Sequence, residues 1–363
     1  MRHISELSNI LRFQFSFDKR KLDCLAQVIM GMISCRTVNL TQLADTLSGK
    51  ATSLSKYRRL QRLFSQWTMV TDGLGAWLIS WFYDADEPVT LTMDRTNWQW
   101  GKAKINFLVV GVVYKRMAIP LMWTLLPKKG NSNCQERIAI LKRVLKYTEK
   151  NRINNLLCDR ECVGKAWFKW LQQEDIPFKI RIKHHYVTET STGKETTIEA
   201  LFYGLGLGQK RVIRGQRTIT GCKVFLTGSR LQSGELMVIA SHDQQGCAIE
   251  LYCERWEIET LFENLKSRGF DLECTHITHP DRLNALMTGV TLAACWAYRV
   301  GEWRIDQGQL IKIKKHGRPQ RSLFRHGLDY IRCQLIQHVQ WKYIKPLINL
   351  WQLLVPPKPM ITS

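Results

Sequence analysis

Apolar residues recur every three to four positions through the first 80 residues, which is the period of helices with one buried face. Within this stretch, residues 40–47 predict a short helix and Ser48-Gly49 a turn, with Ser53 or Ser55 as the N-cap of the next helix. This outline is typical of a helix-turn-helix. The second helix is basic, as a DNA major groove would require, and carries Lys56, Arg58, Arg59 and Arg62. A solvated basic face on a short helix pair is the alternative.

From Val89 the period shortens to two, which indicates strands. The expected elements, in order, are strands at 89–94, 105–114 and 117–125, a helix at 136–150, a strand at 153–159, a helix at 164–173 and a strand at 178–182. The order βββαβαβ predicts an α/β domain in which helices flank a sheet. The first three strands are expected to form an antiparallel meander.

Residues 186–246 interrupt this alternation, because glycines separate short β-prone runs. We expect an inserted β-rich subdomain here. Its segment 210–217 is basic, so Arg211 and Arg214 are candidates to lie along a DNA backbone, and protection of an exposed edge strand is the alternative. The elements expected after residue 280 are an apolar helix at 281–304, a basic loop at 312–318 and a closing helix at 322–339.

An uninterrupted helix is expected over 251–266, and it carries the densest candidate chemistry. At about 100° per residue, a single narrow polar strip is formed by Tyr252, Arg255, Glu259 and Lys266. The apolar stripe beside it should be buried and consists of Ile258, Leu261, Phe262 and Leu265. Arg and Lys hold phosphate oxygens, and a carboxylate can hold a hard divalent cation. The strip therefore suits a phosphodiester, whereas a surface helix with incidental ion pairs is the alternative.

Charge indicates the class of partner. Lys and Arg outnumber Asp and Glu by 53 to 31, and the formal net charge of +22 is spread along the chain. We therefore expect a polyanion, with nucleic acid ahead of a membrane surface. Eleven cysteines without a CxxC pair indicate reduced thiols, and the first residues lack a secretory apolar core. We expect a cytoplasmic protein without a membrane span, in which the apolar stretch 283–300 is a buried helix.

Three carboxylates stand where one metal site can form. Asp94 is expected to end the first strand and Asp159 the fourth, and strand ends place side chains at the rim of a sheet. If these strands are neighbours, Glu259 can complete a cluster, and such a cluster repels itself unless a divalent cation such as Mg²⁺ joins it. A turn or cap role for each Asp is the alternative. The tryptophans near these acids can stack on an unpaired base or belong to the core, and they are Trp98, Trp100 and Trp256.

These residues carry a resemblance to a known family. The spacing Y-x2-R-x3-E-x6-K is matched by Tyr252, Arg255, Glu259 and Lys266. Asp94 in Met-Asp-Arg-Thr-Asn-Trp and Asp159 in Cys-Asp-Arg-Glu-Cys match two acidic boxes, so residues 89–266 resemble bacterial DDE transposases of the insertion-sequence-four family. Two departures are visible. Cys162 stands where relatives usually have a bulky apolar residue, and no Trp lies in 236–240, where some relatives place a base-stacking one.

The resemblance implies an RNase H-like core with a mixed five-stranded sheet, formed by residues 86–185 and 247–305 around the insertion at 186–246. From the helical patterns on either side of this core, we expect a helical DNA-binding domain at 1–85 and a helical C-terminal segment at 306–363. Asp94, Asp159 and Glu259 would bind two Mg²⁺ ions, with Mn²⁺ able to substitute. By the same resemblance, the phosphates near the cleaved end would be held by Tyr252, Arg255 and Lys266, and the flipped base would lie beside Trp256.

The implied function is cut-and-paste transposition in the bacterial cytoplasm, associated with the nucleoid. Water and then the freed 3′-hydroxyl attack phosphodiesters at the inverted-repeat ends, a hairpin intermediate precedes strand transfer into target DNA, and a homodimer pairs the two ends. Two other functions stay open. One is a metal-dependent endonuclease without strand transfer, and the other is a DNA-binding regulator with a degenerate core.

Overall fold

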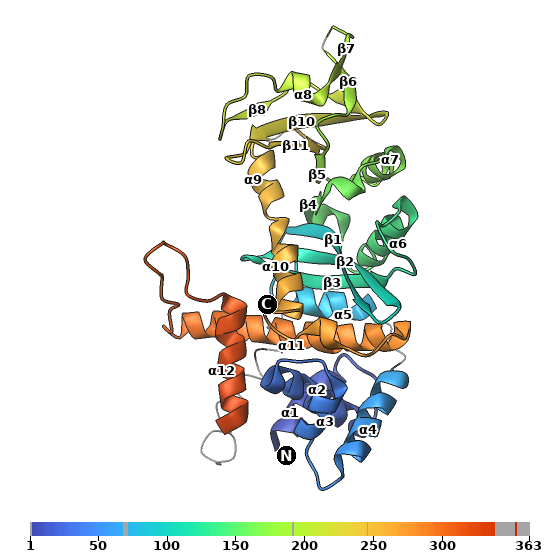
Figure 1. Cartoon of the computed structure of the whole chain (residues 1–363), viewed down its shortest axis with the longest axis vertical. Helices are drawn as coiled ribbons and strands as arrows, with labels where there is room; N and C mark the ends of the chain where they lie inside the picture. The colour runs from blue at the N-terminus through green and yellow to red at the C-terminus, as the bar shows by residue number, and fades with distance from the viewer. Residues whose placement is uncertain (1, 68–71, 191, 245, 338–352, 354–363) are drawn as a thin grey trace, which may run out of the picture. The chain divides into compact units, whose positions relative to one another are not determined.

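The computed structural model describes residues 2–67, 72–190, 192–244, 246–337 and 353 (Figure 1). The chain forms two compact units. The sheet unit comprises Asp84–Asn97 and Asn106–Leu261, and the helical unit comprises Met1–Tyr83, Trp98–Ile105 and Phe262–Ser363.

The sheet unit is built on one mixed sheet. Its strands are β1 (Val89–Trp100), β2 (Ala103–Tyr114), β3 (Met117–Leu125), β4 (Ile153–Cys158), β5 (Phe178–Ile182), β8 (Lys210–Val212), β9 (Arg217–Ile219), β10 (Cys222–Arg230) and β11 (Leu236–Ser241). Within the described residues these nine strands follow the order β3-β2-β1-β4-β5-β11-β10-β8, with β9 paired to β10. β1, β4 and β5 run parallel, while β11 and β10 continue antiparallel beyond β5. The predicted order βββαβαβ is confirmed.

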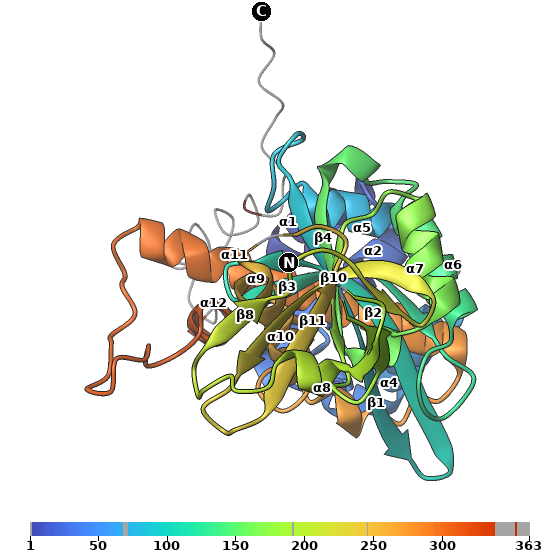
Figure 2. The same ribbon diagram turned by 90° about the horizontal axis from the view of Figure 1, so that it is seen from above.

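Helices cover both faces of this sheet, as Figures 1 and 2 show. On one side lie α6 (Cys134–Val144) and α7 (Lys165–Gln173), and on the other lie α9 (Ala248–Cys253) and the first part of α10 (Trp256–Leu265). β11 is buried along its whole length, and β2 is buried from Ile105 to Val113. Strands that are apolar on both faces require a cover on each side, so these helices follow from the composition of the strands.

The sheet is wider than the five strands expected. The longer strands of residues 186–246 do not form a sheet of their own, because β8, β10 and β11 join the main one at β5. The apolar run of β11 explains the difference, since a strand buried on both faces needs a neighbour on each edge. The rest of this segment contains a small pair, β6 (Val187–Glu189) with β7 (Glu195–Thr197), and the short helix α8 (Ile198–Leu201).

Two element ends differ from the sequence pattern. The expectation that Asp94 ends the first strand is wrong, because β1 continues to Trp100 with Thr96 and Trp98 buried in alternation. α6 ends at Val144, six residues before the predicted end, and a 3₁₀ turn, η1 (Lys150–Arg152), leads into β4. A second 3₁₀ turn, η2 (Arg160–Cys162), follows β4.

The helical unit contains α1 (Arg2–Arg12), α2 (Lys19–Cys35), α3 (Leu40–Thr46), α4 (Ser53–Ser65), α5 (Asp72–Ile79), the 3₁₀ turn η3 (Leu272–Cys274), α11 (Pro280–Asp306) and α12 (Leu323–Gln337). The helices predicted in the first 80 residues are confirmed where they are described. α4 is capped by Thr52, which accepts from the Ser55 amide, rather than by Ser53 or Ser55. The predicted end of the closing helix at 338–339, and residues 338–352 and 354–363 of the expected C-terminal segment, lie outside the described residues.

The long helix α11 is the core of this unit. Its residues from Leu283 to Tyr298 are almost all buried, as expected for the apolar stretch. α12 crosses it closely, and a Cβ placed on Gly327 would lie 1.8 Å from the Ala297 carbonyl oxygen. None of the helices in the described ranges is both long enough and apolar enough to cross a membrane.

Candidate active site

The helix expected over 251–266 is two helices, and the expectation of one uninterrupted helix is wrong. A tight turn at Glu254-Arg255 separates α9 from α10, with i to i+3 bonds from the Arg255 amide to Tyr252 (3.0 Å) and from the Ile258 amide to Arg255 (3.1 Å). Tyr252, Arg255 and Glu259 nevertheless lie side by side across the turn, because Arg255 hydrogen-bonds to both of the others. The predicted burial of the apolar stripe is confirmed for Ile258, Leu261, Phe262 and Leu265.

Asp94 and Asp159 lie at equivalent points on neighbouring parallel strands. The first and fourth strands are adjacent, as expected, and Met93 of β1 is in register with Cys158 of β4. Each Asp is the next residue along its strand. Asp159 makes no capping hydrogen bond to the turn η2 that follows it. Its carboxylate therefore has no part in capping that turn.

The electrostatics of Asp94 show that carboxylates gather here. Burial raises the pKa of Asp94 to about 6, and the nearby charges of Glu161 and Asp159 add to that effect. The Arg255 guanidinium and the Arg95 backbone amide oppose it. A buried acid with a raised pKa beside two others is stabilised by a cation.

Arg255 supplies positive charge at this point. Its Nη1 donates to Asp94 Oδ2 at 3.0 Å and its Nη2 to Glu259 Oε1 at 2.6 Å, so one guanidinium joins the two carboxylates. Its Nε donates to the Tyr252 hydroxyl at 3.1 Å. Burial by itself would lower the pKa of Arg255, but Tyr252, Asp94 and Glu259 together raise it above its ordinary value. The guanidinium is therefore charged at any physiological pH.

Tyr252 and Arg255 are interior residues. They are 1% and 5% exposed, and Tyr252 packs in an apolar cluster with Met237, Ile239 and Ile249. Burial also raises the pKa of Tyr252, which keeps the phenol protonated. The donors predicted for phosphate are thus directed at side chains of the protein itself.

A second ion pair frames the two aspartates. Arg95 Nε donates to both oxygens of Glu161, at 3.1 and 2.9 Å, and its Nη1 donates to Asn106 at 3.1 Å. The Ser132 hydroxyl donates to Glu161 as well, at 3.0 Å. The pair is largely buried, with side chains 12% and 13% exposed. It links the residue after Asp94 to the second residue after Asp159, and so fixes their backbones.

Glu257 anchors α10 to the sheet, a role that the sequence pattern did not predict. Its carboxylate accepts from the Tyr114 and Arg116 amides, each at 2.9 Å, in the tight turn between β2 and β3. Lys115 and Arg116 have φ of 42° and 75°, so the turn points these amides toward α10. Burial raises the pKa of Glu257 to about 7, although both amides act to lower it. In the sequence it is simply another charged residue on a helix.

The carboxylate oxygens present suit a hard divalent cation, although the three acidic side chains are not grouped closely enough to hold one in this arrangement. Across the described part of the chain, no three His, Cys, Asp or Glu side chains are close enough to hold a metal ion as they stand. The oxygen ligands that such a cation prefers are supplied by Asp94 and Asp159 on adjacent strands. Glu259 is tied to Asp94 through a guanidinium, which is itself a cation between two carboxylates.

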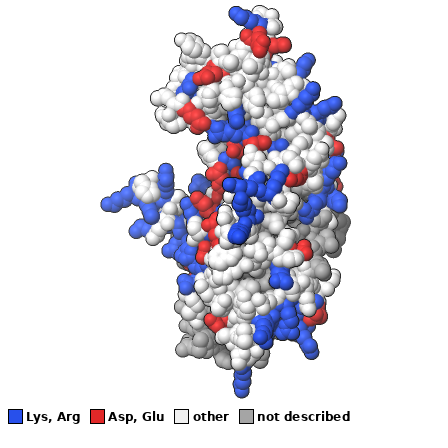
Figure 3. All heavy atoms as spheres, turned by 45° about the vertical axis from the view of Figure 1, so that its right-hand side comes forward, with Lys and Arg blue, Asp and Glu red and all other residues white. Residues whose placement is uncertain are grey.

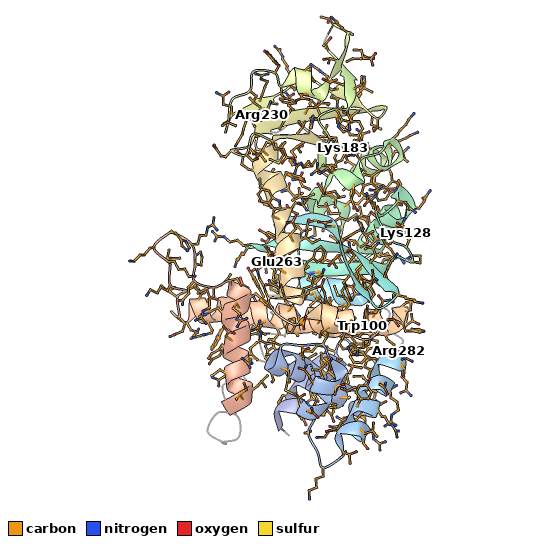
Figure 4. All side chains as sticks on the ribbon, viewed as in Figure 1. Trp100, Lys128, Lys183, Arg230, Glu263 and Arg282 are labelled. Atoms are coloured by element: carbon orange, nitrogen blue, oxygen red, sulfur yellow. The ribbon has the colours of Figure 1, made fainter. Side chains whose placement is uncertain are left out.

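The basic residues of α4 fall into two groups. Arg58 and Arg62 line an open groove of about 600 Å³ together with Ser55, Gln61, Ser65 and Arg282. Figure 3 shows Lys and Arg gathered over this helix, and Figure 4 labels Arg282 near the start of α11. Arg59 is instead half-buried, and its charge acts on the thiol of Cys24 in α2. Arg282 was not predicted, because no local pattern in the sequence connects it to α4.

Other predicted contacts differ in their surroundings. Arg211 lies on the edge strand β8 and donates to the carbonyls of Leu201 and Tyr203, while Arg214 is exposed. These placements suit protection of an edge strand at least as well as contact with a ligand. Lys266 pairs with Glu273 at 2.7 Å.

The three tryptophans do not share one environment. Trp98 is a core residue, 8% exposed, whereas Trp256 is 47% exposed. Trp100 is 39% exposed and stacks on His276, with ring centroids 4.0 Å apart. Only Trp100 and Trp256 therefore present a surface to a ligand.

Comparison with known proteins bears on this site directly. A family model described as a transposase DDE domain matches residues 87–296, which is more than half of the 363 residues and includes Asp94, Asp159 and Glu259. A search of curated proteins finds no match. The matched span begins just before β1 and ends within α11. The chain therefore belongs to the family of transposases with a DDE domain, enzymes that cleave DNA.

Proposed function

We propose that this transposase cuts the ends of a mobile DNA element and transfers them into target DNA, with Mg²⁺ or Mn²⁺ as cofactor, in the manner of the insertion-sequence-four family. One observation carries the proposal. Asp94 and Asp159 follow paired residues on adjacent parallel strands, and Glu259 is joined to Asp94 through Arg255. Three acids in this arrangement suit two-metal phosphodiester chemistry.

Asp94, Asp159 and Glu259 are the residues that would hold the metal. A bound divalent cation supplies activation of the attacking hydroxyl and stabilisation of the leaving oxygen. The residues around them have supporting roles. The Arg95–Glu161 pair fixes the backbones of the two aspartates, and Glu257 fixes α10 and with it Glu259.

Arg255 would change partners during the reaction. Its Nη1 and Nη2 now donate to two different carboxylates, and a guanidinium can bind two oxygens of one phosphate in bidentate fashion. If Asp94 and Glu259 held a divalent cation, they would no longer need neutralisation by Arg255, whose Nη groups would then be free to bind DNA. Tyr252 would follow as a further donor, since its hydroxyl is held by Arg255 Nε.

The helical unit offers a candidate DNA contact of its own. Arg58, Arg62 and Arg282 line one groove, and none of the three has an ion pair within the described residues. Unpaired arginines with neighbouring hydroxyls suit phosphate contact. We propose that these three hold duplex DNA, and that two copies of the chain pair the two ends.

The test is cleavage of a plasmid that carries the DNA flanking this reading frame, where short inverted repeats are expected. Asp94→Asn, Asp159→Asn and Glu259→Gln should each abolish cleavage with Mg²⁺ or Mn²⁺ while retaining DNA binding. Asp175→Asn is the matched control, because its carboxylate is 91% exposed in the same unit. Full cleavage by any one of the three active-site variants would refute the assignment.

Joining is measured separately. Precleaved ends are incubated with a target plasmid, and strand transfer products support transposition. Cleavage without joining would identify an endonuclease instead, and binding without any metal-dependent cleavage would identify a regulator.

A further inference from the structure

The segment between α11 and α12 is an ordered hairpin rather than an open loop. We define the basic hairpin as residues 310–321. Ile313 and Pro319 form a bridge, the Gln320 amide donates to Lys312 O at 2.8 Å, and the Lys314 amide donates to Arg318 O at 2.9 Å. Figures 1 and 2 both show this segment standing away from the two helices that it connects.

The basic hairpin carries one sign of charge. It contains no Asp or Glu, and its cationic residues are Lys312, Lys314, Lys315, Arg318 and Arg321. All five are exposed. Arg321 reaches Asp329 at 3.4 Å, whereas the other four have no ion pair in the part of the chain that the structure describes. Like charges at this density repel each other, and an anionic partner removes that cost.

The base of the basic hairpin is attached to the helical unit. His326 of α12 hydrogen-bonds the Gln309 carbonyl at 3.0 Å, and the Arg321–Asp329 pair holds the other end. Two apolar side chains on the same hairpin are left in water, with Leu310 76% and Ile313 58% exposed. The basic hairpin thus has a fixed base, a cationic tip and exposed apolar side chains. Together these features are typical of a segment that binds a partner.

The tip itself is compact. The Gly317 amide donates to Lys314 O at 2.9 Å with φ of +77° at Gly317, and the Arg318 amide donates to the His316 ring at 3.3 Å. Pro319 then fixes the backbone after Arg318. Lys, Arg and His are the side chains that the negative potential of a narrow minor groove attracts.

We propose that the tip of the basic hairpin, residues 314–318, enters the minor groove of A·T-rich duplex DNA. This contact is separate from the active site and from the groove along α4. The minor groove is about 6 Å wide, and two paired strands with their side chains are wider than that, so only the tip can enter it. Leu310 and Ile313 lie beside the tip, and apolar side chains of minor-groove proteins insert between base steps. The proposal rests on the proposed function only in taking DNA as the partner.

The test compares binding to short duplexes of three kinds in the full chain. Inosine·cytosine pairs display the minor-groove pattern of A·T pairs but the major-groove pattern of G·C pairs, because inosine lacks the N2 amino group. The wild type should bind A·T and inosine·cytosine duplexes equally and about tenfold more tightly than G·C duplexes. Equal affinity for all three duplexes would overturn the proposal.

Charge removal identifies the residues responsible. The triple variant K314A/K315A/R318A should lose the preference, and the slope of log affinity against log salt should fall by about 2 to 3, since each phosphate contact contributes about 0.9. The control K142A/K146A/K169A removes the same charge from exposed positions of α6, its following turn and α7, and should keep the preference. A triple variant with an unchanged preference would also overturn the proposal.

The two proposals are separated by making these measurements in the Asp94→Asn background without divalent cations. The groove preference then depends on the basic hairpin alone. If cleavage assays fail while the preference persists, only the proposed function is rejected. If the preference is absent while cleavage proceeds, only the proposed role of the basic hairpin is rejected.

Discussion

Replacement of Arg255 by Ala should destabilise the sheet unit through Asp94. The substitution removes the guanidinium that donates to Asp94 at 3.0 Å and to Glu259 at 2.6 Å. Asp94 is then left buried beside the charges of Asp159 and Glu161, which already raise its pKa. The substitution leaves a buried carboxylate without its partner, and an uncompensated buried charge strongly lowers the free energy of unfolding.

The two bonds contribute unequally. The Arg255 side chain is 6% exposed and Asp94 20%, so their bond should contribute about 2 to 3 kcal/mol, as expected for a charge-assisted bond away from water. Glu259 is 52% exposed, and solvent screening reduces its bond to about 0.5 kcal/mol. We therefore expect Arg255→Ala to lower the free energy of unfolding by about 3 kcal/mol.

The loss should depend on pH. Arg255 lowers the pKa of Asp94, so its removal raises that pKa above the present value of about 6. At a pH below 6 the carboxyl takes up a proton in both proteins, and the missing guanidinium matters less. Above 7 the wild-type carboxylate is ionised, and the variant loses most.

Urea unfolding on either side of that pKa measures the effect. Asp94→Asn and the double variant complete a cycle, in which we expect a coupling of about 2 kcal/mol at the higher pH. Lys150→Ala is the control, since its pair with Glu174 is on the surface of the same unit. Mg²⁺ should also raise the urea midpoint more for Arg255→Ala than for the wild type, because the cation can replace the guanidinium.

Two results would refute this reasoning. One is a loss for Arg255→Ala no larger than that for Lys150→Ala above pH 7, and the other is a coupling near zero between Arg255 and Asp94. Either would mean that Asp94 is not held by the guanidinium in solution.

Three further predictions concern the framework. Glu257→Ala should lower the free energy of unfolding by about 2 kcal/mol, because two turn amides lose their acceptor. Glu257→Gln should restore about half of that free energy. Equal losses of unfolding free energy for the two variants in urea would contradict this prediction. Burial lowers the pKa of His326 below 6.5, so the neutral ring, which can donate to the Gln309 carbonyl, contributes stability that is full above pH 6.5 and is lost as the pH falls. The difference in melting temperature between wild type and His326→Gln should therefore shrink as the pH falls. A difference that stays constant with pH would contradict this prediction. Gly327→Ala should cost about 3 kcal/mol or more in thermal or urea unfolding, since its Cβ would meet the Ala297 carbonyl oxygen at 1.8 Å, and a near-neutral effect would show that α12 can move.

Local features of the chain were enough to predict much of the sheet unit. The change of hydrophobic period at Val89 predicted strands, and the order βββαβαβ allowed the first and fourth to be neighbours, which the pairing of β1 with β4 confirms. The spacing of the apolar residues predicted the buried face of α10. These features depend on residues a few positions apart, where periodicity is a direct physical signal.

The three-dimensional arrangement of the site depended on tertiary structure. Arg255 and Asp94 are 161 residues apart in the chain, and Glu257 and Tyr114 are 143 apart, so no local pattern indicates that they pair. The turn that separates α9 from α10 accompanies the burial of Tyr252 and Arg255, and β11 joined the main sheet because a strand buried on both faces needs neighbours on both edges. The sequence by itself determined which residues are candidates for the chemistry, and long-range packing and charge pairing decided which of them meet, because those contacts form only when the chain is folded.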